Sequence, residues 1–452
     1  MNAYDQVIGY EEIKGELNRI SDVIRNPDKY RNLGVTIPHG VMLYGEPGVG
    51  KTLLANCFIE DTGRKKYVIR KDKANGEFVE HITKTFRKAA EHGPSVIFLD
   101  DIDKYSEGSM RDSDAEEYVA IQSGIDMIKD NGYDIFCIAT CNDIENLPRS
   151  LKRAGRFDNR IEVNAPRDLP VASAIIGHYL KEKNVSDEID PQEIARLMEG
   201  KSCAELENVI NEAGIYAGYS GKAQIDQDDI IRACLRVVFD APEAMSGSMN
   251  DQDVRMVATH EAGHVVVSEV LNPGIVNMSS VRQHTGNNGG ITRVSKPECF
   301  DSSFKLHEDN IIRSLGGKAA VEIVYGVPDM GSETDFEMAF KILDHFTTEL
   351  HVYGFDAHSN YDDSEYWQSA KNHRITYELE RYYRQAKKLL IDNRDFLDAV
   401  IEALVSKQTL TFRDIREIRD RVNISDLGKT GAEADGYNVP SKAGNPQPRK
   451  EK

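Results

Sequence analysis

The chain has 452 residues, of which 40% are hydrophobic and 29% are charged, the balance of a folded globular protein and not of a disordered or collagen-like chain. Its 75 acidic residues outnumber its 56 basic residues and give a formal charge of −19, which argues against general binding to a polyanion such as nucleic acid. At about 150 residues per domain, this length predicts about three folded units.

No stretch of the sequence has the length and apolar character of a membrane span. Crossing a bilayer takes roughly 18 to 20 apolar residues, and the first residues also lack the basic and then apolar layout of a signal peptide. We therefore expect a cytoplasmic protein without direct membrane insertion.

The six cysteines contain no repeated C-x-x-C pair, so neither a disulfide framework nor a thiolate zinc site is expected. They are Cys57, Cys137, Cys141, Cys203, Cys234 and Cys299.

The first part of the chain, residues 1–168, alternates short apolar runs with helical stretches. Examples of these runs are residues 40–44, 95–99 and 134–139. Apolar runs between helices are typical of a parallel sheet with helices on both faces. Residues 169–241 then change to helical periodicity, which predicts a small helical domain.

The second part of the chain begins with a predicted linker at residues 242–250, which are rich in small and turn-forming residues. Residues 251–427 predict a third, mainly helical unit. Residues 428–452 are heavy in Gly, Pro, Lys and Ala, so burial cannot offset their ordering entropy and we expect a disordered tail.

The first chemical motif follows the apolar run at residues 40–44 and opens a helical stretch. It fits G-x-x-x-x-G-K-[ST], a loop whose backbone N–H groups surround nucleotide phosphates. Lys51 is expected to reach the β and γ phosphates of ATP, and Thr52 to ligate Mg²⁺. A glycine-rich turn that merely opens a helix is the alternative. The predicted binding residues are Gly45, Glu46, Pro47, Gly48, Val49, Gly50, Lys51, Thr52 and Leu53.

Polar residues after the next two apolar runs complete the predicted nucleotide site. Asp100 is expected to hold Mg²⁺, directly or through water, and Asp101 to polarise the attacking water. Asn142 is a candidate for orienting that water, while Arg153 and Arg156 are candidates for stabilising charge on the γ-phosphate. The alternatives are a helix cap for the carboxylates and ordinary surface charge for the arginines.

The second chemical motif is H-E-x-x-H, in a segment that predicts a buried helix. His260 and His264 are four residues apart and share one helix face, so both imidazoles can meet one zinc ion. Glu261 then lies alongside as the general base for peptide-bond hydrolysis. The alternative is a helix whose histidines are core or surface residues. A catalytic zinc needs a third protein ligand, and the candidates are Glu322, Glu333, Asp335, Glu337, His345 and His351.

These two motifs, in this order, resemble the FtsH-type ATP-dependent zinc proteases, whose ATPase part is an AAA+ module. Further landmarks of the family lie at residues 8–10, 33–40 and 200–206. The resemblance implies that Asn142 is the family's sensor residue, and that Arg153 and Arg156 are fingers acting on the neighbouring subunit's nucleotide. A homo-oligomeric ring, by analogy a hexamer, is therefore implied.

The resemblance extends into the peptidase half at residues 315–326 and 331–336. It implies Asp335 as the third zinc ligand and Glu322 as a helix residue near the site. The implied fold is an α/β AAA+ module with a helical lid, followed by a mainly α-helical zinc metallopeptidase domain. The implied activity is ATP-dependent unfolding and degradation of protein substrates, with Zn²⁺, ATP and Mg²⁺ as cofactors. The alternatives are a protein-remodelling AAA+ ATPase with weak or absent peptidase activity, and an ATP-independent peptidase with a largely structural ATPase ring.

The chain departs from the family pattern at three places. Asp101 stands where the family has Glu, which withdraws the carboxylate by roughly 1.5 Å, so slower ATP hydrolysis or a displaced water is expected. Residues 73–76 replace the family's aromatic pore loop and Phe78 lies beyond the loop glycine, so the usual grip on substrate is not expected. The family's amino-terminal membrane anchor is missing from this sequence, which predicts a soluble relative or membrane attachment through a partner.

Overall fold

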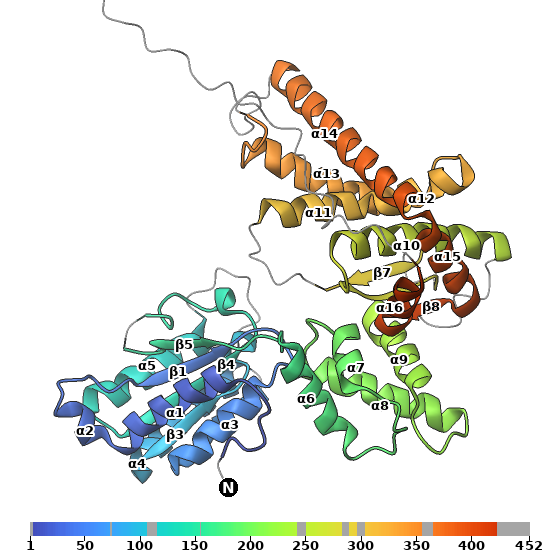
Figure 1. The fold of residues 1–452 in the computed structure, drawn as a ribbon. Coiled ribbons are helices and arrows are strands. Elements are labelled where there is room, and N and C mark those ends of the chain that lie inside the picture. The colour runs from blue at the N-terminus through green and yellow to red at the C-terminus, as the bar shows by residue number, and fades with distance from the viewer. Residues whose placement is uncertain are drawn as a thin grey trace, which may run out of the picture. The chain divides into compact units, whose positions relative to one another are not determined.

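Figure 1 shows a computed structural model of the chain, which divides into two units, Met1–Pro242 and Glu243–Lys452. The predicted disordered tail, most of the predicted linker and Cys299 lie outside the described residues. The structure describes residues 3–72, 75–105, 115–153, 155–241, 250–282, 289–295, 303–354 and 365–422.

The first unit is built on a five-stranded parallel sheet in the order β2-β3-β4-β1-β5. The central strands β1, β3 and β4 are buried almost throughout, because helices cover both faces of the sheet and only continuous apolar runs satisfy both. This arrangement confirms the predicted α/β module. The strands are β1 Gly40–Tyr44, β2 Lys65–Ile69, β3 Ser95–Leu99, β4 Ile135–Cys141 and β5 Asn159–Glu162.

Two pairs of helices cover the two faces of this sheet (Figure 1). Helices α1 (Glu11–Arg25) and α3 (Lys51–Thr62) contribute to one core cluster, which takes Val41 and Leu43 from β1. Helices α4 (Asn75–His92) and α5 (Glu116–Asn131) contribute to the opposite cluster, which takes Met42. Alternate residues of a strand point to opposite faces, so one apolar run supplies both cores. The short elements are α2 Pro27–Arg31, η1 Ile102–Lys104 and η2 Ile144–Asn146.

Four helices follow the sheet in the same unit. Their starts are set by capping residues: Ser202 forms a capping box with Glu205 at the start of α8, and Asp226 forms one with Asp229 at the start of α9. Such caps satisfy backbone N–H groups that have no partner inside the helix. The helices are α6 Leu169–Leu180, α7 Pro191–Leu197, α8 Cys203–Tyr219 and α9 Gln227–Phe239.

The pore-loop region of the first unit is described only in part. Lys73, Ala74 and the side chain of Asn75 lie outside the described residues. Phe78 is fully buried in α4, where its ring meets that of Tyr105 edge-on at a centroid distance of 4.9 Å. Phe78 is therefore a core residue and is not exposed to contact substrate.

The second unit is mainly helical, with the long helix α10 (Asp251–Leu271) at its core. All residues of α10 from Ala258 to Val270 except His260 are buried, and the helix packs against α12 and α15. A three-stranded antiparallel sheet, β7-β6-β8, lies beside it. The remaining elements are β6 Val276–Ser280, β7 Ile291–Val294, α11 Phe304–Ser314, α12 Gly316–Tyr325, α13 Glu333–Thr348, α14 Glu365–Asp392, α15 Arg394–Lys407, β8 Thr409–Thr411 and α16 Phe412–Arg421.

Helices α10 and α12 touch through backbone atoms at one point. A Cβ added to Gly263 would lie only 2.3 Å from the carbonyl oxygen of Gly316. No side chain larger than hydrogen fits there, so the glycine inside the predicted metal motif sets the distance between the two helices. This close packing fixes the helix that carries both histidines.

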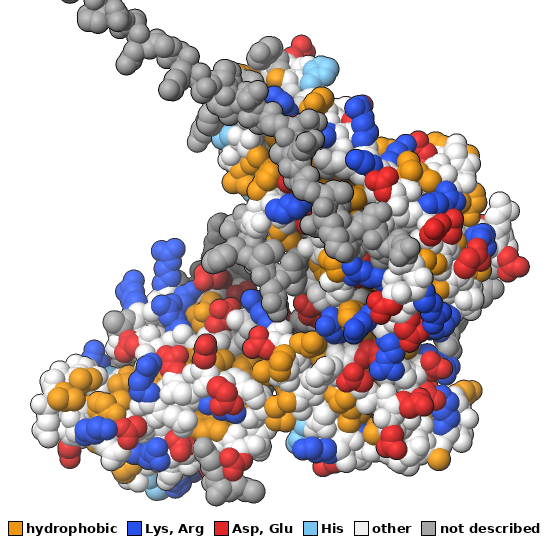
Figure 2. All heavy atoms as spheres, in the orientation of Figure 1, with side chains coloured by type: hydrophobic (Ala, Val, Ile, Leu, Met, Phe, Trp, Pro, Cys, Tyr) orange, Lys and Arg blue, Asp and Glu red, His pale blue; other side chains and the backbone are white. Residues whose placement is uncertain are grey.

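Two further properties bear on the predictions from composition. Among the helices in the described part of the chain, none is long and apolar enough to cross a membrane. On the face shown in Figure 2, acidic and basic side chains are intermixed, so the net negative charge is not gathered into one patch there.

Candidate functional site

The predicted phosphate loop lies between β1 and α3 and borders a pocket of about 630 Å³. The ammonium group of Lys51 donates hydrogen bonds to the carbonyl oxygens of Gly45 and Glu46, both at 2.7 Å, and to Oδ1 of Asn142 at 2.8 Å. These acceptors hold the Lys51 ammonium group beside the phosphate loop, where phosphate is expected. The loop residues that line the pocket are Pro47, Gly48, Val49, Gly50, Lys51, Thr52 and Leu53.

Asp100 directly follows β3 and is only 3% exposed. Its Oδ1 accepts hydrogen bonds from the hydroxyls of Thr52 at 3.1 Å and Thr140 at 2.8 Å, and its Oδ2 pairs with the Arg70 guanidinium. Burial raises the pKa of this carboxyl, but the donors around it lower the pKa more, so it lies below its ordinary value. The Thr52 hydroxyl and an ionised carboxylate thus lie together, as a magnesium site requires.

Asp101 and Asn142 both line the pocket near Lys51. Asp101 has a left-handed backbone with φ 53°, and its carboxylate accepts a hydrogen bond from Lys104 at 2.7 Å. The backbone N–H of Asn142 donates to Oδ1 of Asp103 at 3.1 Å, which leaves the Asn142 amide facing Lys51. The Asp101 carboxylate therefore lies at the pocket, but a lysine holds it.

The two predicted finger arginines are not among the residues that line this pocket. Arg156 forms a two-point contact with Asp126, at 3.1 and 2.8 Å, and donates to the Ser150 carbonyl at 2.7 Å. Arg153 is exposed and forms no ion pair with any described residue. Of the two, Arg153 is the one left free to reach another molecule.

Residues from the lid also line the pocket, and the sequence analysis did not name them as binding residues, although Cys203 lies within the family landmark at residues 200–206. They include His178, Tyr179 and Cys203. The backbone N–H of Ala204 donates to the carbonyl of Gly48 at 3.1 Å, so the start of α8 is tied directly to the phosphate loop.

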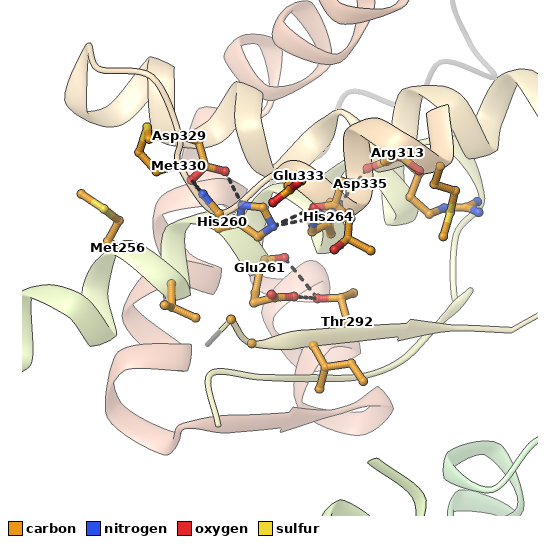
Figure 3. A pocket seen from close by; sticks show the side chains of 18 of the residues that line it. Met256, His260, Glu261, His264, Thr292, Arg313, Asp329, Met330, Glu333 and Asp335 are labelled. Carbon is orange, nitrogen blue, oxygen red and sulfur yellow. Dashed lines mark hydrogen bonds and ion pairs between the residues drawn. The ribbon is translucent and has the colours of Figure 1, made fainter. Parts of the chain in front are cut away.

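In the second unit, three predicted ligands converge (Figure 3). His260 and His264 lie one turn apart on α10, and their Nε2 atoms are 3.0 Å apart. Oδ2 of Asp335, in the first turn of α13, lies 3.1 Å from the first Nε2 and 3.3 Å from the second. Among the described His, Cys, Asp and Glu residues, these three form the one group whose donor atoms are placed to share a metal ion.

The hydrogen bonds on the far side of each ring decide which nitrogens are free. Nδ1 of His264 contacts the carbonyl oxygen of Arg313 at 2.8 Å, and Nδ1 of His260 contacts Oδ2 of Asp329 at 2.7 Å. Both partners accept hydrogen bonds, so each Nδ1 carries a ring hydrogen, and each Nε2 presents a lone pair when a metal ion replaces any proton there. Three ligand atoms thus face one another and need a cation between them, either a proton or a metal ion.

This set of atoms fits zinc. A tetrahedral zinc ion with bonds of about 2.0 to 2.1 Å separates its ligand atoms by roughly 3.3 Å, close to the spacing found here. Burial lowers the pKa of His260, but hydrogen bonds to Asp329 and Asp335 raise it more, to about 10. The site therefore favours a positive charge between its acceptors, and two imidazoles with one carboxylate are a zinc donor set.

Glu261 lies beside the two histidines with its side chain 3% exposed (Figure 3). Its Oε2 accepts a hydrogen bond from the Thr292 hydroxyl of β7 at 2.6 Å, and burial raises its pKa. A carboxyl group with a raised pKa is better suited to accept and return a proton near neutral pH. A Cβ on Gly317 would come within 2.5 Å of the His260 ring, so α12 also limits where that ring can lie.

The other candidates for the third ligand are not in this group. Glu322 pairs with Lys387 at 2.6 Å and Glu337 with Lys341 at 3.3 Å. The three metal ligands line a cleft of about 1040 Å³. Glu333 lines this cleft too, whereas Glu322, His345 and His351 do not. Glu322 is therefore not part of the described cleft lining, and its nearness to the site stays a prediction.

Asp329 is expected to strengthen metal binding by fixing the His260 ring. Replacing Asp329 with Asn removes the charge that orients Nδ1–H, and we expect zinc affinity to fall by about 10- to 100-fold. Competition with a chromophoric zinc chelator measures this. Glu337→Gln, an exposed change on α13, is the matched control, and an unchanged affinity of the Asp329 variant would contradict the role.

Comparisons with known proteins agree with both sites. The family model described as "ATPase family associated with various cellular activities (AAA)" matches residues 41–165, and peptidase family M41 matches residues 247–418. ATP-dependent zinc metalloprotease FtsH 2 of Symbiobacterium thermophilum is 31% identical over 444 residues, which are 92% of this chain and 74% of the relative.

Two other relatives are similar over a comparable length. FtsH 2 of Phytoplasma mali is 30% identical over 438 residues, and FtsH of Mycoplasma pneumoniae is 31% identical over 451 residues. The matches cover 92% and 93% of this chain. The chain spans 62% of the length of each of these two relatives. As the two motifs predicted, the chain belongs to the FtsH family of ATP-dependent zinc metalloproteases.

Proposed function

We propose that this protein is an ATP-dependent zinc endopeptidase that unfolds and degrades protein substrates. The observation that carries the proposal is the convergence of His260, His264 and Asp335, with Glu261 alongside, in a chain that also has a nucleotide pocket. Membership of the FtsH family supports it, since the relatives are named as ATP-dependent zinc metalloproteases. The cofactors are Zn²⁺, ATP and Mg²⁺.

In the peptidase unit, His260, His264 and Asp335 would hold the zinc ion. When bound, zinc polarises the scissile carbonyl and lowers the pKa of the attacking water. Glu261 accepts the proton from that water and returns it to the leaving amine, while Thr292 keeps its carboxylate oriented. Asp329 fixes the His260 ring for this chemistry.

In the ATPase unit, Lys51 binds the β and γ phosphates, and Thr52 with Asp100 holds Mg²⁺. Asp101 polarises the lytic water and Asn142 orients it. Arg153 and Arg156 act on the nucleotide of a neighbouring subunit, which requires a homo-oligomeric ring, by analogy a hexamer. For Arg156 to do so, its contact with Asp126 has to be replaced by a contact with the neighbouring subunit's nucleotide when the ring forms. The cytoplasmic location stays a prediction.

The alternative, a remodelling ATPase with weak or absent peptidase activity, has less support. It was suggested by Asp101 and by the altered pore loop. Both features concern ATP turnover and substrate grip, and neither touches the metal centre. A buried general base beside three matched ligands has no use in a purely structural peptidase domain.

Replacing Glu261 with Gln tests the proposed chemistry. The amide cannot accept a proton, so cleavage of an unfolded test protein is expected to fall by about 10²- to 10⁴-fold, while ATP hydrolysis and zinc content stay unchanged. Degradation of folded and unfolded proteins, with and without ATP, is measured by gel. Glu337→Gln is the control, and proteolysis retained in the Glu261 variant would exclude this mechanism.

Asp101 is expected to limit the rate of ATP hydrolysis. Asp101→Glu extends the carboxylate by roughly 1.5 Å toward the nucleotide, and we expect kcat to rise by about 10- to 100-fold, because misplacement by this distance costs a comparable factor. Asp101→Asn is expected to lower kcat. A steady-state phosphate-release assay measures both, with Asp130→Glu on the exposed face of α5 as the control. A Glu variant no faster than the wild type would refute this assignment.

A further inference from the structure

Arg313 stands out among the residues of the peptidase cleft. It lies in the last turn of α11 and lines the cleft, yet it is only 8% exposed. Its Nη1 donates to Oδ1 of Asn310 at 2.6 Å. Its Nε and Nη2 are buried and have no hydrogen-bond partner among the described residues. The guanidinium therefore carries two buried donors that no described residue uses.

No acidic side chain in the described part of the chain forms an ion pair with this guanidinium, although the charge of Asp309 acts on it from a distance. Asp309 lies one helical turn before Arg313 on α11, but its carboxylate pairs with Lys305 at 2.8 Å and accepts from the Asn272 amide at 3.1 Å. A buried charge without a counterion is costly. The cleft thus keeps a cationic group whose partner is to be supplied by another molecule.

The unused donors have a specific shape. Nε–H and Nη2–H lie on the same edge of the planar guanidinium and form the fork that matches the two oxygens of a carboxylate. Nη1, on the other side, is held by Asn310. The free edge is therefore the one that recognises a carboxylate through two parallel hydrogen bonds.

The fork of Arg313 belongs to a residue that also contacts the metal centre. The carbonyl oxygen of Arg313 accepts the hydrogen bond from Nδ1 of His264, so the residue is attached to the metal centre through its backbone. Figure 3 shows its side chain leading away from the two histidines. Within the described lining of the cleft, Arg313 is the only lysine or arginine, whereas Asp253, Glu261, Asp329, Glu333 and Asp335 are acidic.

We propose that Arg313 forms a subsite that binds a carboxylate of the peptide substrate, either an acidic side chain or the carboxyl terminus. The proposal rests on the peptidase function proposed above. When a carboxylate enters, the long side chain turns its fork into the cleft and gives up little, since its one side-chain partner is Asn310. The acidic residues that line the cleft repel an acidic peptide. Arg313 gives the carboxylate of such a peptide one site that binds it.

The test uses the full chain and a neutral, unstructured peptide. A single Glu or Gln is placed at successive positions, and the carboxyl terminus is either free or amidated. At one position, or at the free carboxyl terminus, kcat/KM of the wild type is expected to favour the carboxylate by about 10- to 100-fold. A preference tied to the Glu position identifies a side-chain subsite, and one tied to the free terminus identifies a carboxyl-terminal subsite.

Arg313→Met and Arg313→Gln are expected to reduce this ratio to about 1, and Arg313→Lys to give an intermediate value, because lysine keeps the charge but lacks the fork. Arg394→Met, which removes an exposed arginine paired with Asp398 at 2.9 Å, is the control and keeps the ratio. A wild type without preference would overturn the proposal. So would a preference that survives in both neutral variants, or an equal loss for Glu and Gln peptides.

A binding measurement separates this proposal from the peptidase function. Labelled Glu and Gln peptides are titrated by fluorescence anisotropy into the zinc-loaded Glu261→Gln protein, with and without Arg313→Met. A Glu preference that Arg313→Met removes supports the subsite even if the wild type cuts no peptide. Equal binding of both peptides by the Glu261→Gln protein would overturn the subsite even if the wild type is an active peptidase.

Discussion

Three hydrogen-bond acceptors face one another across about 3 Å in the peptidase unit, and the surrounding structure prevents them from moving apart. Without a cation, such an arrangement is repulsive. The chain holds it through Asp329 and the Arg313 carbonyl, which fix the two rings from behind. The backbone contact between Gly263 and Gly316 fixes the helix itself. The stability lost in holding the acceptors together is recovered when a metal ion binds between them.

The nucleotide pocket is built on a different principle. Parallel strands deliver their carboxyl ends to one edge of the sheet, so the phosphate loop after β1, Asp100 after β3 and Asn142 after β4 meet although they are far apart in sequence. The lid reaches the same edge through the Ala204–Gly48 hydrogen bond. The start of α8, which a capping box stabilises, is therefore linked directly to the phosphate loop.

The parts of both sites that depend on local spacing are predictable from sequence. Four residues are one helical turn, so His260 and His264 must share a face, and the glycine spacing of the phosphate loop is equally local. Asp335 is 75 residues from His260, and no periodicity links the two, so only the family resemblance singled it out.

Other contacts had no signal in the sequence at all. A backbone carbonyl such as that of Arg313 is independent of residue type, and Asp329 lies between helices, where no repeating pattern applies. The pairing of Arg156 with Asp126 depends on how α5 packs. Phe78 is buried because it lies on the apolar face of the amphipathic helix α4, and its place in the sequence beside the predicted pore loop does not indicate that face.

The most direct measurement is X-ray absorption at the zinc edge on the purified full chain, together with its metal content. We expect one zinc ion per chain, surrounded by nitrogen and oxygen atoms at about 2.0 to 2.2 Å with the scattering signature of two imidazoles. A chain that retains no zinc, or a zinc ion bound to sulfur at about 2.3 Å, would contradict it.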